Sequence, residues 1–339
     1  MAEAPTTTTE VFVVHNVPTD VVMTAECLST RVIDVPPLAE SSVLLKVSHI
    51  GLEPYMRAFC ISNPRAWPVG SVPSGKVVGE VVQSSSNRFA PGDVIKCNAR
   101  WRAYTWVAID DKTLVERVDA SVPPQIYLGL AGSGGRSAHL PLKHLARPKA
   151  GQTAVVTAAA SCVGLAAVQL LALDGVRVAG SAGSDDKVAL LKSLGCAAWN
   201  YKSEDAATAL ARVCPDGVDY LFDMVGGALR TAVLEKMNGG GQIVSLGSMA
   251  KTDGGAGHSS GGGEREEQLI AQKGLTNYSS NVNNYEAEFE ACTAEIIGLY
   301  KVGKLVSKDT VVEGLENLPS AFVGIFKGAN TGRMVVKVA

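Results

Sequence analysis

Residues 155–164, VVTAAASCVG, have the residue types and spacing of a phosphate-binding turn. They begin within the strand-like run TAVV and lead directly into the apolar, helix-forming stretch GLAAVQLLALDG. Small residues between a strand and a helix let backbone N–H groups bind a pyrophosphate at the helix N-terminus. Ala159 and Ser161 replace the first two glycines of the usual G-x-G-x-x-G pattern, and Ser161 fits only if its backbone angles stay in the common region. The residues predicted to contact a dinucleotide here are Ser161, Cys162, Val163 and Gly164.

The next strand ends without the acidic residue that favours NAD. Residues 177–181, RVAGS, complete a strand–helix–strand unit, and an NAD site would place Asp or Glu at the end of this strand. The chain instead continues through Ser184 to Lys187. We therefore expect NADP, with the Ser184 hydroxyl and the Lys187 ammonium on the 2′-phosphate. Asp185 and Asp186 would then have to face solvent. An exposed turn with a surface lysine is the alternative interpretation.

Composition predicts a globular protein with two domains. The chain has 339 residues, of which 46% are hydrophobic and 19% charged, and its net charge is −2. This charge gives no reason to expect nucleic acid or a membrane surface as a partner. The N-terminus MAEAPTTTTE lacks the features of a signal peptide, and the apolar run within residues 162–173 is too short to span a bilayer. We expect a cytoplasmic protein.

The cysteines and histidines do not predict a metal site. Seven cysteines form no C-x-x-C pair, and five histidines show no ligand spacing. Neither a zinc lobe nor a disulfide framework is expected.

The pattern of expected secondary structure changes near residue 150. Before residue 125, short β-prone runs such as SVLLKVSHIGL and GKVVGEVVQSSS predict a mostly antiparallel β domain. Beyond residue 150, strands and helices alternate, which predicts a doubly wound parallel sheet. The low-complexity residues 253–263 predict a mobile loop, either a lid or an exposed linker. The stretch EAEFEACTAEIIGLYKVGKL predicts one long amphipathic helix.

Three segments make the chain resemble a known family from about residue 40 onward. They are EPYMR at residues 53–57, similar to D-P-Y-M-R; VAGSAGSDDKVALLKSLGCAAWNYK; and the tail VEGLENLPSAFVGIFKGANTGRMVVKV. With them the chain resembles the zinc-independent medium-chain dehydrogenase/reductases, in the prostaglandin reductase and plant alkenal double-bond reductase branch. The resemblance implies an α/β fold: a GroES-like, mostly antiparallel β catalytic domain (residues 1–127 and 305–339) plus a doubly wound Rossmann domain (residues 128–304).

The resemblance also implies roles for individual residues. Lys187 and Tyr201 are similar to residues that bind the adenosine 2′-phosphate, and Asn330 to one on the nicotinamide side. Tyr55 falls where the branch lines its substrate pocket, and Arg57 would support that wall. Without the family, Tyr201 would be a half-buried packing aromatic and Asn330 a turn residue. Core packing accounts equally well for Trp101 and Tyr104.

The implied activity is metal-free reduction of the C=C bond of an α,β-unsaturated ketone or aldehyde by NADPH, in a homodimer. Zinc-dependent relatives have a Cys ligand near Leu52 and Glu53 and a Gly-His-Glu motif at residues 74–76, where this chain reads Ser-Gly-Lys. Tyr55 is the first candidate for a donor to the substrate carbonyl or for a pocket wall. Quinone reduction and a non-catalytic NADP-binding role remain as alternatives.

Several positions depart from the family. Thr252 stands where relatives have a pocket tyrosine, so Tyr55, Tyr278 or a water would have to replace that donor. Met224 replaces an asparagine. Pro141 is expected to disturb the helix that normally begins just before it, because proline lacks the N–H donor of a helix interior.

Overall fold

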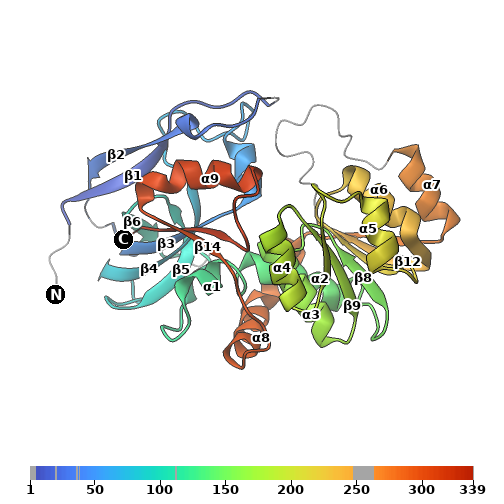
Figure 1. The fold of residues 1–339 in the computed structure, drawn as a ribbon. Helices are drawn as coiled ribbons and strands as arrows, with labels where there is room; N and C mark the ends of the chain where they lie inside the picture. The colour runs from blue at the N-terminus through green and yellow to red at the C-terminus, as the bar shows by residue number, and fades with distance from the viewer. Residues whose placement is uncertain are drawn as a thin grey trace. The chain divides into compact units, whose positions relative to one another are not determined.

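The structure, a computed structural model, describes residues 5–19, 21–35, 37, 39–110, 113–246 and 263–338. The chain divides into two compact units (Figure 1): unit 1 comprises Met1–Gly129 and Asp309–Ala339, and unit 2 comprises Leu130–Lys308. The expected domain boundaries lie after residues 127 and 304, and those of the units lie after Gly129 and Lys308.

Unit 1 is built mainly from antiparallel strands. Its larger sheet has the order β14-β15-β3-β4-β5-β7, with β6 paired to β3, and β1 and β2 form a separate two-stranded sheet. Every strand pair in these two sheets is antiparallel except β14 with β15. The strands are β1 (Thr7–Val13), β2 (Leu28–Asp34), β3 (Ser42–Leu52), β4 (Ser74–Ser84), β5 (Val94–Arg100), β6 (Tyr104–Ala108), β7 (Glu116–Arg117), β14 (Thr310–Glu313) and β15 (Met334–Lys337). The helices are η1 (Ala25–Cys27), η2 (Pro54–Phe59), α1 (Pro124–Leu128), η5 (Leu315–Asn317) and α9 (Leu318–Phe326).

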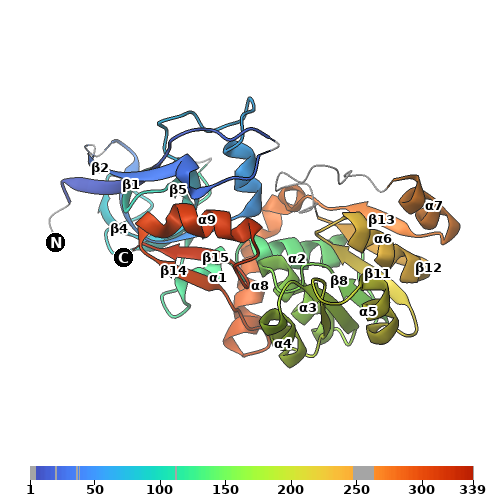
Figure 2. The same cartoon turned by 45° about the horizontal axis from the view of Figure 1, so that its top comes forward.

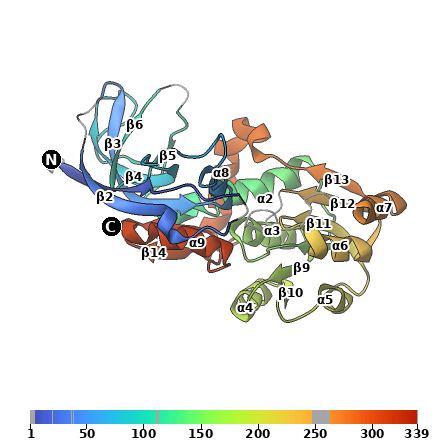
Figure 3. The same cartoon turned by 90° about the horizontal axis from the view of Figure 1, so that it is seen from above.

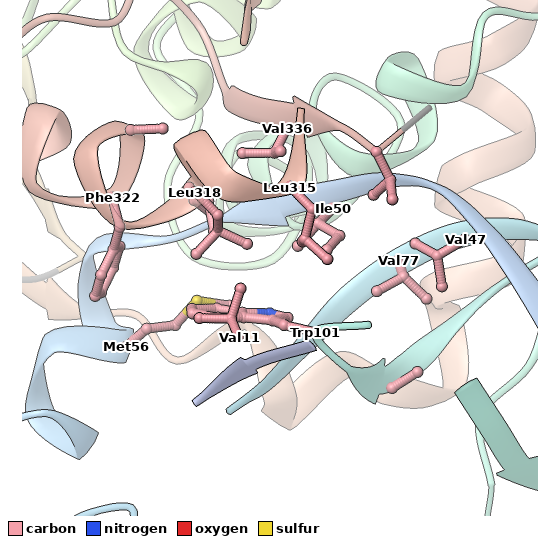
Figure 4. Close-up of a cluster of buried hydrophobic side chains, with 14 of the residues drawn as sticks. Val11, Val47, Ile50, Met56, Val77, Trp101, Leu315, Leu318, Phe322 and Val336 are labelled. Atoms are coloured by element: carbon pink, nitrogen blue, oxygen red, sulfur yellow. The ribbon is translucent and has the colours of Figure 1, made fainter. Parts of the chain in front are cut away.

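The core of unit 1 lies between its large sheet and α9. Trp101 is fully buried and packs edge-on against Trp67 and Phe322, with ring centroids 5.5 and 6.0 Å apart. Figure 4 shows Trp101 among Met56, Leu318 and other apolar side chains from the strands and α9. Core packing is therefore what positions Trp101, and the same cluster holds Met56 and with it the short helix η2.

Unit 2 is a doubly wound parallel sheet, as predicted. Its strand order is β10-β9-β8-β11-β12-β13, and every neighbouring pair is parallel. The strands are β8 (Thr153–Val156), β9 (Arg177–Ala182), β10 (Ala197–Asn200), β11 (Val218–Asp223), β12 (Met237–Ser245) and β13 (Thr276–Ser279). The helices are α2 (Ser133–His144), α3 (Cys162–Leu173), α4 (Asp185–Ser193), α5 (Ala206–Val213), α6 (Gly227–Lys236), α7 (Glu264–Gln272), η4 (Val282–Glu288) and α8 (Phe289–Lys301).

Helices cover both faces of this sheet. α2 contacts α3 and α8, whereas α6 contacts α5 and α7, and the two groups are seen in Figure 2. Figure 3 shows α4 and α5 on opposite sides of β10, as right-handed crossovers require when the chain reverses direction in the sheet. The reversal falls between β8 and β11, which are neighbours. Ligands bind at such a point, beyond the carboxyl ends of the strands.

Two sequence-based expectations for the helices were wrong. α2 continues through Pro141 to His144, because Pro141 is buried in the packing of α2 and lies within one turn of the helix end. The long helix expected over residues 286–305 is shorter, since α8 spans Phe289–Lys301. Tyr285 has non-helical backbone angles and stacks on His144, and Gly303, with φ of 72°, ends the helix at the other side.

Candidate functional site

The turn after β8 has the geometry of a phosphate-binding turn. Ser161 is the N-cap of α3, and its Oγ accepts a hydrogen bond from the Gly164 N–H at 3.1 Å. Its φ of −73° and ψ of 170° lie in the extended region, which any residue adopts, so a serine can replace the glycine at this position. Ala158 has a φ of 48°, which is uncommon for a residue with a side chain and typical of strained functional turns.

Gly164 lets α3 approach this turn closely. A Cβ at this position would lie 2.4 Å from the Ala158 carbonyl oxygen and 2.7 Å from the Ala159 backbone. These contacts are with backbone atoms that cannot rotate away. Gly164 therefore has the role of the third glycine of the usual pattern, although the first two are absent. Cys162 begins the helix, and Val163 beside it is half-buried.

A buried carboxylate that the sequence analysis missed supports the turn. Asp223, at the end of β11, accepts hydrogen bonds from Thr157 Oγ1 at 2.9 Å and from the Val225 and Gly226 N–H groups at 3.1 and 3.2 Å. Its other oxygen lies 3.0 Å from Nη1 of Arg230. Asp223 thus joins the ends of β8 and β11, the neighbouring strands at which the sheet reverses. The acidic residue directly after the strand YLF is the sequence signal.

Arg230 is held by a second carboxylate. Its Nε lies 3.1 Å from Glu266 Oε2, and its Nη1 donates to Ser245 Oγ at 2.8 Å. Glu266 belongs to α7 and also accepts a hydrogen bond from Thr231 at 2.7 Å. Both charged side chains are buried, so each depends on the other for its stability.

Two lysines and a tyrosine lie together beyond the carboxyl end of β9. Tyr201 packs on Gly183, whose absent Cβ would lie 2.7 Å from the tyrosine oxygen. Burial lowers the pKa of the Lys187 ammonium, and the nearby charge of Lys202 lowers it further. Ser184 begins α4, and its side chain makes no capping hydrogen bond to the helix. An anion at this position would be attracted by both ammonium groups.

The acidic neighbours of Lys187 are exposed to solvent. Asp185 and Asp186 are both exposed, as the NADP prediction requires, and Asp185 accepts a hydrogen bond from Asn200 Nδ2 at 2.8 Å. Asn200 in turn accepts from the Lys202 N–H at 3.0 Å. Sequence reasoning missed Lys202, although it directly follows Tyr201 in the N-Y-K segment.

The candidate substrate residues of unit 1 lie on η2. The Tyr55 ring is half exposed and edge-on to Phe59, with centroids 6.2 Å apart, and burial and then the nearby Glu53 charge raise the pKa of its hydroxyl. Arg57 is buried, and its Nη2 donates to the Val21 carbonyl at 3.0 Å. Arg57 therefore supports the segment beside η2, whereas Tyr55 presents its ring to solvent.

Asn330 lies in the same unit, in the turn before β15. Its Nδ2 donates to the Gly332 carbonyl at 2.7 Å, and Gly328 and Gly332 have φ values of 67° and 61°. The amide thus stabilises its own turn. Tyr278 lies in unit 2, on β13 opposite Val244, and is half-buried. Thr252 and residues 253–262 of the predicted loop lie outside the described residues.

The described residues contain neither a cluster of metal ligands nor a helix that could span a membrane. No group of three or more His, Cys, Asp or Glu side chains in the described part of the chain is placed to hold a metal ion. None of the helices seen there is long and apolar enough to cross a membrane.

Comparison with known proteins identifies the family. The family model described as "Zinc-binding dehydrogenase" matches residues 162–297, and the one described as "N-terminal domain of oxidoreductase" matches residues 12–116. The chain is 34% identical to "Putative NADP-dependent oxidoreductase YfmJ" of Bacillus subtilis, with 91% of each chain covered. It is 33% identical to "Prostaglandin reductase 1" of Mus musculus, covering 90% of this chain and 92% of the relative. It is also 33% identical to "2-alkenal reductase (NADP(+)-dependent)" of Nicotiana tabacum, with 89% of each covered.

A solved structure agrees with this assignment. The complex of CurA with NADPH from Vibrio vulnificus superposes with a TM-score of 0.88 at 28% identity, covering 98% of this chain and 99% of CurA. The predicted combination of a β domain with a parallel-sheet Rossmann domain is confirmed. The chain belongs to the medium-chain dehydrogenase/reductases, in the zinc-independent branch that contains the prostaglandin reductases and the 2-alkenal reductases.

Proposed function

We propose that this chain uses NADPH to reduce the C=C bond of α,β-unsaturated ketones or aldehydes. The observation that carries the proposal is the pair of lysines beyond the end of β9, where an NAD-specific protein has a ribose-binding carboxylate. Relatives named for NADP-dependent alkenal and prostaglandin reduction, similar over about nine-tenths of the chain, support the choice of substrate.

The described residues of unit 2 fit the cofactor. The N–H groups at the start of α3, with Gly164 allowing close approach, would bind the pyrophosphate. Ser184, Lys187 and Tyr201 would hold the 2′-phosphate, and we add Lys202 as a second cation. By family resemblance, Asn330 would contact the nicotinamide side. When bound, the cofactor supplies the hydride.

The reaction adds one hydride at the β-carbon and one proton at the α-carbon of the substrate. Negative charge develops on the carbonyl oxygen before the proton arrives, so that oxygen needs a hydrogen-bond donor in a site that excludes water. The half-exposed Tyr55 ring would form a wall of this site, and Arg57 would fix η2 beneath it. Tyr278 remains a further candidate for contact with the substrate.

Consumption of NADPH against a panel of substrates tests this proposal. We expect the nicotinamide absorbance to fall with enals and enones, and the product to be saturated at the C=C bond with its carbonyl intact. The matched control is the saturated ketone of the same length, which should not react. Oxidation of NADPH by quinones alone would instead identify a quinone reductase. Tight NADPH binding without any turnover would identify a non-catalytic relative. The homodimer and the cytoplasmic location stay predictions.

A further inference from the structure

The β8–α3 turn, residues 157–161, contains a backbone conformation that its own chain does not favour. Ala158 has a φ of 48°, in the left-handed region, and a residue with a side chain stays there only when its surroundings fix it. Its carbonyl accepts a hydrogen bond from the Ser161 N–H at 2.9 Å. The start of α3, where the cofactor diphosphate would bind, therefore has a defined position only while Ala158 keeps this conformation.

Ala158 lies between two residues that neighbouring strands hold. On one side, the Ala159 N–H donates to the Ser181 carbonyl of β9 at 2.9 Å. On the other side, the Thr157 N–H donates to the Phe222 carbonyl of β11 at 3.1 Å. The backbone on both sides of Ala158 is thus tied to the sheet.

The Thr157 side chain adds a second connection to β11, in which its hydroxyl both accepts and donates. Its Oγ1 accepts a hydrogen bond from the Met224 N–H at 2.8 Å and donates its proton to Asp223 Oδ1 at 2.9 Å. Thr157 and Asp223 are 0% and 1% exposed, so water cannot replace either bond. A valine of the same shape could make neither bond. It would leave the buried N–H without its acceptor and the carboxylate one donor short.

Asp223 can hold this hydroxyl because its own carboxylate is fixed. Its Oδ1 also accepts hydrogen bonds from the Val225 and Gly226 N–H groups, and its Oδ2 lies 3.0 Å from Arg230 Nη1. Glu266 of α7 lies 3.1 Å from Nε of the same guanidinium. These three charged side chains are at most 9% exposed, and buried charges are tolerated when they are paired and hydrogen-bonded. Side chains of α6 and α7 are thereby connected to the β8–α3 turn.

We propose that Asp223, held by Arg230 and Glu266, is a positioning residue that keeps the β8–α3 turn in its cofactor-binding conformation through the Thr157 hydroxyl. In this scheme none of these side chains touches the cofactor. They act through the backbone of the turn and so set its affinity for the diphosphate. The part of the proposal that concerns affinity rests on the cofactor site proposed above, whereas the part that concerns the conformation of the turn does not.

Hydrogen exchange of single backbone amides, followed by NMR, tests the positioning without any ligand. In T157V the Met224 amide loses its acceptor, and the Gly164 amide, bonded to Ser161 Oγ, should also exchange about tenfold faster or more. The Tyr201 amide is bonded to the β9 backbone at 3.0 Å and should keep its rate. T157S keeps the hydroxyl and should restore slow exchange. An unchanged Gly164 rate in T157V, or an equal acceleration at Tyr201, would overturn the proposal.

Two fragments of the cofactor separate the turn from the rest of the site. ADP carries the diphosphate without a 2′-phosphate, and adenosine 2′-phosphate carries the 2′-phosphate without the diphosphate. In calorimetric titrations of T157V, the Kd for ADP should rise about fivefold or more, and that for adenosine 2′-phosphate by less than about twofold. T157S should bind both fragments like the unchanged chain. So should T153V, which makes the same substitution at the buried first residue of β8.

D223N tests whether Asp223 acts through Thr157. It should raise the Kd for ADP about fourfold or more in the unchanged background and by less than about twofold in T157V, where the hydroxyl is already absent. Removal of the negative charge alone would act in the opposite direction on an anion. If D223N does not fold, R230K replaces it, because lysine keeps the charge and loses the forked contact to the two carboxylates.

These titrations also separate this proposal from the proposed cofactor site. An equal rise in Kd in both backgrounds, an unchanged Kd for ADP in T157V, or an equal loss of both fragments would overturn the positioning role. If the unchanged chain binds neither fragment, the proposed cofactor site fails. The exchange rates still decide in that case whether the Thr157 hydroxyl positions the turn.

Discussion

Replacing Lys187 with Met would test the choice of NADP most directly. The substitution removes the ammonium and keeps an unbranched side chain in the first turn of α4. Hydrogen bonds to charged groups contribute about 1.5–3 kcal/mol each, so the loss should raise the Kd for NADPH about 10- to 150-fold. Lys187 is half-buried beside Lys202, so this interaction is screened less than one at a free surface. NADH has no 2′-phosphate, and its Kd should change by less than about twofold.

The assay is calorimetric titration of each variant with NADPH and with NADH. K192M is the matched control, because Lys192 lies in the last turn of the same helix and is exposed. K202M should weaken NADPH binding selectively but less than K187M, since Lys202 is exposed and acts mainly through its charge. An equal loss of NADPH and NADH in K187M would refute the assignment, as would an equal effect of K192M.

The same lysine predicts a pH dependence whose sign follows from its lowered pKa. Lys187 loses its proton below the ordinary lysine value of 10.5, so NADPH affinity should fall as the pH rises through this lowered pKa. NADH affinity should stay level over the same alkaline range. The effect on folding has the opposite sign: the folded state disfavours the charged form, and this cost disappears as the pH rises from the folded toward the unfolded pKa. Parallel pH titrations with both cofactors, repeated with K187M, measure this difference.

Three further predictions concern the scaffold of the site. G164A should lower the free energy of unfolding by about 1–3 kcal/mol, because the added Cβ meets fixed backbone atoms. G298A places its Cβ in open space on α8 and should be neutral or stabilising by up to about 1 kcal/mol. Urea denaturation measures both variants. D223N should lower the free energy of unfolding by about 3 kcal/mol, because it breaks a buried ion pair. D216N affects an exposed pair with Arg177, 3.7 Å apart, and should lower it by less than about 1 kcal/mol. Similar losses in the two variants would contradict this ranking. Burial raises the pKa of six cysteines to between about 11 and about 12: Cys27, Cys60, Cys97, Cys196, Cys214 and Cys292. A thiol reagent at neutral pH should therefore label these cysteines only when the chain unfolds. Rapid labelling of the native chain would contradict their burial.

The cofactor side of the site is predicted best from the sequence, because short local segments form it. The β8–α3 turn and the β9–α4 turn each lie within about a dozen residues, and parallel pairing of β8, β9 and β10 places both at one edge of the sheet. The missing carboxylate after β9 and the position of Lys187 can therefore be read from the order of residues. Lys202 was missed because its closeness to Lys187 depends on β9 and β10 ending side by side.

The buried network around Asp223 could not be predicted, because its members meet only in the folded sheet. Asp223 and Thr157 are 66 residues apart, and Arg230 is joined to Glu266 of α7 across 36 residues. The sequence shows that Asp223 directly follows the strand YLF, but it does not show that Thr157, Arg230 and Glu266 meet there.

Glu53 shows the limit of reasoning from residue types alone. EPYMR gives no reason to expect that this glutamate is buried or that it forms an ion pair. The ion pair depends on Arg333, 281 residues beyond Leu52, which the pairing of β15 with β3 brings within 3.0 Å of the carboxylate. A buried carboxylate is costly unless it is paired, so the environment of Glu53 is decided by a strand that lies at the other end of the chain.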